Sequence, residues 1–104
     1  MNQYRVDFRS IPWEYLSTGV RSMVAKGNSK QLRLVEFTKE FVEPDWCMKG
    51  HIGYVLEGKL EINFNGTIVT YDPGDAISIP EGENHKHMAK TITDVVKIFL
   101  VENT

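Results

Sequence analysis

The segment that decides the fold is Gly74-Asp-Ala-Ile-Ser-Ile-Pro80-Glu-Gly82-Glu-Asn-His85. It holds a short apolar run between two turns. The first turn is Asp72–Asp75 and the second is Pro80–Asn84. Glycine and proline favour turns because glycine tolerates positive φ and proline presets its own φ. The segment therefore predicts a turn, a short strand, a second turn and then the start of another strand at His85.

Short strands are also predicted on both sides of this segment. Residues 32–37 and 60–65 alternate with period two, which is typical of half-buried strands, and residues 95–101 are apolar on both parities. The turn-forming pair Asn65-Gly66 reads as a tight hairpin. No stretch longer than about one turn shows a helical period. The pattern predicts an all-β sandwich or barrel with many short strands.

Length and composition exclude several classes of protein. The chain has 104 residues, and we expect residues 1–104 to form a single domain. A net charge of −2 gives no basic surface for nucleic acid, and no apolar run reaches the length of a membrane span. The N-terminus lacks the apolar region of a signal peptide, and a single cysteine excludes a disulfide within the chain. We expect a cytoplasmic protein with no nucleic-acid partner and no membrane partner.

Potential metal ligands are gathered in two short segments. Asp45, Cys47 and His51 lie where a loop enters a strand, and His85 and His87 lie two residues apart, on one face if they are in a strand. Carboxylate, thiolate and imidazole groups together suit a late first-row transition metal. A simpler interpretation is also open. Histidines after a turn are often polar residues at a strand start, and a lone cysteine is often a small core residue.

The segment quoted first resembles the second motif of the cupins, G-x5-P-x-G-x2-H-x3-N. Gly74, Pro80, Gly82 and His85 fall at the spacing of that motif, and Ala89 stands where asparagine is usual. The resemblance implies a jelly-roll barrel, also called a double-stranded β-helix, built from two antiparallel sheets. It also implies a small pocket inside the barrel, with His85 facing inward.

The first cupin motif, G-x5-H-x-H-x3-4-E-x6-G, is matched clearly only at its end, in residues 51–58. His51 falls at the glutamate position of that motif, and Asp45 and Cys47 fall at its two histidine positions. The resemblance therefore implies a metal site made of Asp45, Cys47, His51 and His85. His87 is then the candidate catalytic residue, as an acid/base or a substrate contact, because a histidine titrates at roughly pH 6.5.

Two classes of function follow from this resemblance. The first is a metal-dependent enzyme acting on a small molecule, either an iron-dependent oxygenase or an isomerase. His51, His85 and Asp45 have the composition of an Fe(II) site with two histidines and one carboxylate, whereas ligation by Cys47 favours Zn²⁺ and Lewis-acid chemistry. The alternative is a sensor or carrier that has lost its metal and binds a small-molecule ligand without catalysis.

The resemblance also implies a homodimer. The segments Tyr4–Phe8 and Val95–Val101 are candidates for the contact because both are rich in apolar residues. Packing within one chain explains these segments equally well.

Overall fold

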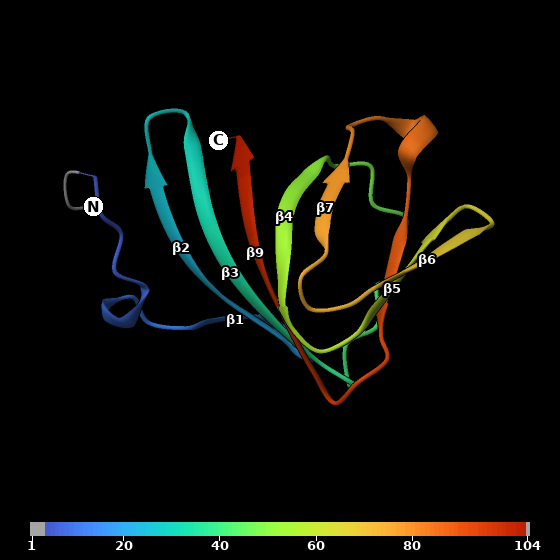
Figure 1. The fold of residues 1–104 in the computed structure, drawn as a ribbon, viewed down its shortest axis with the longest axis horizontal. Helices are drawn as coiled ribbons and strands as arrows, with labels where there is room; N and C mark the ends of the chain where they lie inside the picture. The colour runs from blue at the N-terminus through green and yellow to red at the C-terminus, as the bar shows by residue number, and fades with distance from the viewer. Residues whose placement is uncertain (1–3, 104) are drawn as a thin grey trace.

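The computed structural model describes residues 4–103, and these form an all-β fold (Figure 1). The elements run in the order η1 (Phe8–Ser10), β1 (Glu14–Ser17), β2 (Val20–Gly27), β3 (Lys30–Thr38), β4 (His51–Glu57), β5 (Leu60–Phe64), β6 (Thr67–Tyr71), β7 (Ala76–Ile79), η2 (Glu83–His85), β8 (Met88–Thr91) and β9 (Val95–Asn103). The labels η1 and η2 denote 3-10 helices of three residues each. Within the described range, no helix is long and apolar enough to cross a membrane.

The strands form two antiparallel sheets. One has six strands in the order β1-β2-β3-β9-β4-β7, and the other has three in the order β6-β5-β8. The sheets approach each other at the bottom of Figure 1 and diverge toward the top, where β4 begins and where β7 and β9 end. This arrangement confirms the predicted jelly-roll barrel of two antiparallel sheets.

The core lies between the sheets and follows the predicted alternation. Every second residue of β9, from Val96 to Leu100, is buried. The strand pairings set Val35 of β3 and Val55 of β4 opposite Ile98 from either side. Val55 and Val96 are 0% exposed. Burying a side chain of this size stabilises a fold by about 1.5–3 kcal/mol, so this row holds the two sheets together.

The hairpin predicted at Asn65-Gly66 is present between β5 and β6. Asn65 has a φ of 56° and Gly66 a φ of 117°, which only a few residue types adopt without strain. The Gly66 backbone N–H donates to Asn63 Oδ1 at 2.7 Å and closes the turn. The turn therefore follows directly from its two residue types.

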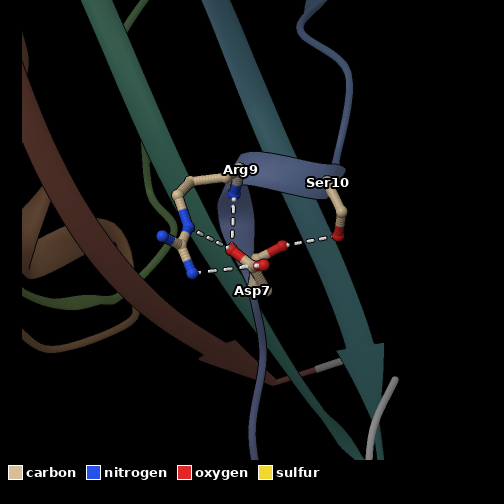
Figure 2. A network of polar contacts seen from close by, with 3 residues as sticks. All are labelled: Asp7, Arg9 and Ser10. Atoms are coloured by element: carbon tan, nitrogen blue, oxygen red, sulfur yellow. Dashed lines mark hydrogen bonds and ion pairs between the residues drawn. The ribbon is translucent and has the colours of Figure 1, made fainter.

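A short polar network orders the N-terminal segment (Figure 2). Asp7 Oδ1 accepts from the Arg9 backbone N–H at 3.0 Å and from Arg9 Nε at 2.9 Å. Ser10 Oγ donates to the Asp7 carbonyl oxygen at 2.8 Å. Next to this network, the Phe8 ring meets the Phe99 ring edge-on, with 6.2 Å between centroids. The two segments proposed for dimer contact therefore touch within one chain, and the homodimer itself stays a prediction.

Candidate metal centre

Three side chains that could hold a metal ion meet at the end of the barrel where β4 begins. Cys47, His51 and His87 each offer one ligand atom, and these atoms all lie within 4.8 Å of one another. His51 is the first residue of β4. Cys47 and His87 form an isolated β-bridge, in which the Cys47 N–H donates to the His87 carbonyl at 2.8 Å and the His87 N–H donates back at 2.9 Å. The bridge therefore fixes the loop that carries Cys47 against the residue just before β8.

Hydrogen bonding orients His87. Its Nδ1 lies 3.0 Å from the His85 carbonyl oxygen, which can only accept, so Nδ1 carries the proton and donates. In neutral His87, Nε2 then carries the lone pair. The residue is buried, at 3% exposure, and its ring centroid lies 5.3 Å from that of His51. A backbone carbonyl that holds the far nitrogen of a histidine is a common support for a metal ligand.

A carboxylate lies beside His51. Its Nδ1 lies 3.4 Å from Glu102 Oε2, and its Nε2 lies 3.7 Å from Cys47 Sγ. The Nδ1 contact is longer than a well-formed hydrogen bond, and the buried Nδ1 has no hydrogen-bond partner among the described protein atoms. Glu102 as a carboxylate favours the proton on Nδ1 and the lone pair on Nε2, which faces Cys47.

Glu102, near the end of β9, accepts hydrogen bonds from two neighbouring side chains. The His51 imidazole is the largest cause that lowers the pKa of Glu102, to about 2, and the Gln31 amide and Arg33 guanidinium lower it further against the opposing effect of burial. Gln31 Nε2 donates to Oε1 at 2.8 Å, and Arg33 Nη2 donates to Oε2 at 2.9 Å. Glu102 is therefore ionised at neutral pH and sits beside the metal-binding group.

Two of the ligands predicted from the sequence lie outside this group. Asp45 is exposed, and its Oδ1 accepts from the Trp46 backbone N–H at 3.0 Å. His85 is also exposed, because it ends the 3-10 helix η2 and does not open a strand. The expected inward orientation of His85 differs from the structure for that reason, and its carbonyl, not its ring, supports His87. Of the four predicted ligands, the structure brings together Cys47 and His51.

The group borders a cavity of about 290 Å³ inside the barrel. Most of the walls are apolar, contributed by Val20, Val35, Phe37, Phe41, Leu60, Ile62, Ile77, Ile79, Ala89, Ile98 and Leu100. Glu43 is a further polar residue in the lining, and its Oε1 accepts from the Ala89 backbone N–H at 3.2 Å. Burial raises the pKa of Glu43, while the Ala89 N–H and the nearby charges of His87 and His51 oppose the shift.

The donor set fits a transition metal ion. One thiol and two imidazoles offer soft and borderline ligand atoms; the His85 carbonyl orients His87, and Glu102 lies beside the far nitrogen of His51. Three protein ligands leave a coordination position free, as in catalytic zinc sites. The site can therefore hold a metal ion and also expose it to a molecule in the cavity.

Comparisons with known proteins agree with the fold. A cupin-2 domain protein from Shewanella frigidimarina is 28% identical, covers 80% of this chain and 79% of its own, and has a TM-score of 0.66. The polyketide cyclase RemF from Streptomyces resistomycificus is 20% identical over 98% of this chain and 80% of its own, with a TM-score of 0.81. A sugar phosphate isomerase of the cupin superfamily from Silicibacter pomeroyi is 18% identical over 96% and 75%, with a TM-score of 0.79.

The two structures at lower identity show the fold alone. Among curated protein sequences, none matches this chain. The cupin domain model matches residues 48–101, which is just over half of the chain. This match runs from just before β4 into β9 and confirms the resemblance carried by the segment from Gly74 to His85. The chain belongs to the cupin domain family.

Proposed function

We propose that this protein holds a divalent transition metal ion at Cys47, His51 and His87 and acts on a small molecule in the barrel. The observation that carries the proposal is the convergence of these three ligand atoms within 4.8 Å on the wall of the cavity. Thiolate and imidazole ligands favour zinc over iron. An Fe(II) site with two histidines and one carboxylate would need a carboxylate in the group, and Asp45 lies outside it.

The proposed chemistry is proton transfer on a bound substrate, as in an isomerisation or a cyclisation. A zinc ion in such a site acts as a Lewis acid that polarises a substrate oxygen or lowers the pKa of bound water. The chain itself contributes apolar walls that exclude water and the carboxyl group of Glu43, which can hold or release a proton inside the cavity. Two structural neighbours, the sugar phosphate isomerase and the polyketide cyclase, are named for reactions of this class.

A second candidate is a small-molecule-binding barrel without a metal. The observation that favours it is the contact of Cys47 Sγ with His51 Nε2 at 3.7 Å, which lies within the range of a sulfur hydrogen bond. This contact gives the thiol and His51 Nε2 a partner without an ion. Both candidates use the same cavity, so metal content decides between them.

The test is elemental analysis of protein purified without chelators, compared across matched variants. We expect near-stoichiometric zinc in the wild type and its loss in Cys47→Ala and in His51→Ala. Asp45→Asn and His85→Gln are the controls, because both residues are exposed and lie outside the group. These two variants keep the metal if the group of three is the site.

Any other result of the elemental analysis would lead to a different conclusion. Metal loss in Asp45→Asn or His85→Gln would favour the ligand set implied by the motif spacing. A wild-type protein that stays metal-free after incubation with Zn²⁺ or Fe²⁺ would refute the metal proposal and leave the binding barrel. Circular dichroism of every variant shows whether a loss of metal is merely a loss of fold.

A further inference from the structure

A second hollow adjoins the cavity at the same end of the barrel. It is a groove of about 690 Å³, lined by Lys30, Gln31, Arg33, Lys49, Gly50, His51, Ile52, Ile79, Glu81, Val101, Glu102 and Asn103. Arg33, Lys49, His51 and Ile79 line both the groove and the cavity. A molecule can therefore occupy both spaces and pass these four residues, two of which are permanent cations.

Arg33 offers an unused donor at this junction. Its Nη2 donates to Glu102, but its Nε is buried and has no hydrogen-bond partner among the described protein atoms. A buried donor on a charged group is costly when it is unpaired, so its partner is expected to be a bound acceptor. Arg33 lies on β3 at the same parity as Val35 and Phe37, both of which line the cavity. The Arg33 side chain therefore lies on the side of β3 that faces the cavity, and it lines both hollows.

Lys49 is the second cation at the junction, and its ammonium group has no ion-pair partner among the described residues. Lys49 is also exposed. Lys30, in contrast, donates to Asn103 Oδ1 at 2.6 Å. Among the carboxylates of the groove, Glu102 is already held by Gln31 and Arg33. The free positive charge of the junction therefore comes from Lys49, while Arg33, whose charge is paired with Glu102, contributes the unused Nε donor.

We infer that the ligand of this protein is a small carboxylic acid with an apolar body. Its carboxylate accepts from Arg33 Nε and Lys49 Nζ at the junction, and its apolar part enters the cavity beside Cys47, His51 and His87. The inference rests on the proposed function in that it assigns a substrate class to the same site. Charged hydrogen bonds of this kind are strong enough to orient a small ligand.

The surroundings favour a carboxylate over two other classes of ligand. Arg33 is already paired with Glu102, so Lys49 is the cation left for the ligand, and its single charge matches a carboxylate monoanion better than a phosphate dianion. The cavity walls are mostly apolar and leave the hydroxyl groups of a sugar without partners. A cavity of about 290 Å³ is also near the lower limit for ligand sites, so the body must be small.

The test is a titration of full-length protein with benzoate, benzamide and phenyl phosphate, followed by amide chemical shifts in NMR spectra. We expect benzoate to bind at least about tenfold more tightly than the neutral benzamide, because the carboxylate forms charged hydrogen bonds that the neutral amide cannot form. Arg33→Met should weaken benzoate binding about tenfold or more, and Lys49→Met about two- to fivefold. Lys90→Met is the matched control, because Lys90 is exposed on β8 and lines neither hollow. It should leave binding unchanged.

Several results would overturn the inference. They are equal binding of benzoate and benzamide, no benzoate binding at millimolar concentration, tighter binding of phenyl phosphate, and benzoate selectivity that survives in both Arg33→Met and Lys49→Met. Lys49→Met keeps the test decisive if Arg33→Met does not fold, because Lys49 is exposed and unpaired.

The same titration on chelator-treated protein separates this inference from the metal proposal. Selectivity for benzoate that persists without metal supports recognition by Arg33 and Lys49, whatever the elemental analysis shows. Benzoate binding that needs the metal and is unaffected in Lys49→Met would overturn the inference and leave the metal proposal standing.

Discussion

Glu102→Gln is expected to remove most of the acid sensitivity of this fold. Folding lowers the pKa of Glu102 from its ordinary 4.5 to about 2, chiefly through His51 and then through Gln31 and Arg33. A shift of this size corresponds to at most about 3 kcal/mol of stability at neutral pH. A domain of this size has a total stability of about 5–15 kcal/mol, so one carboxylate supplies a large share.

The sign of the effect sets the pH window. Because folding lowers this pKa, the contribution is complete well above the ordinary value, and it is lost as the pH falls from roughly 5 to roughly 2. Urea unfolding at a series of pH values measures it. The stability of the wild type should exceed that of Glu102→Gln by up to about 3 kcal/mol at pH 7, and the two should converge in acid.

A matched control and a refuting result complete the experiment. Glu40→Gln changes an exposed loop carboxylate and should follow the wild-type curve. If the wild type and Glu102→Gln lose stability in parallel between pH 5 and pH 2, the network around Glu102 does not hold its charge and this reasoning is wrong.

Three further substitutions test the core and the cavity. Gly53→Ala should destabilise the fold by about 1–3 kcal/mol in urea unfolding, because a Cβ there would collide with the Phe99 carbonyl oxygen and lie 2.6 Å from Leu100 Cδ2; an unchanged midpoint would contradict this packing. Leu60→Ala should cost about 2–5 kcal/mol, since Leu60 is 2% exposed, whereas Leu56→Ala at 50% exposure should cost less than about 0.5 kcal/mol; equal losses would refute the burial assigned to them. Glu43→Gln should be at least as stable as the wild type at pH 7 in thermal unfolding. Burial raises the pKa of Glu43, so the neutral acid stabilises the fold, and this stabilisation is lost as the pH rises through the pKa of Glu43. A large loss of stability in Glu43→Gln would show that the fold needs the charge of Glu43.

The fold could be predicted because its signals are local. The alternation in residues 32–37, 60–65 and 95–101 reappears in β3, β5 and β9, and Asn65-Gly66 forms the hairpin expected of it. These features depend only on which side of a strand a residue faces and on which residue tolerates a positive φ.

The candidate site could be predicted less completely from the sequence, because short turns and pairings between distant segments decide which side chains meet there. The 3-10 helix Glu83–His85 exposes the His85 ring and leaves His87 buried, although the two residues would share a face in a strand. Strand pairing sets Glu102 beside Gln31, far away in the sequence. One signal was nevertheless present, since Arg33 and Glu102 are charged residues at the inward parity of their strands. Whether Asp45 and His85 bind metal stays a prediction.

The backbone bridge between Cys47 and His87 has a consequence for the energetics of ligand capture. Its two reciprocal hydrogen bonds hold Cys47 and His87, whose side chains offer candidate metal-ligand atoms, in place as part of the folded chain. The conformational entropy of bringing these two segments together is therefore lost on folding and not on ion binding. A centre assembled in this way is preorganised. Its affinity for an ion is higher because the two segments are already ordered in the folded barrel.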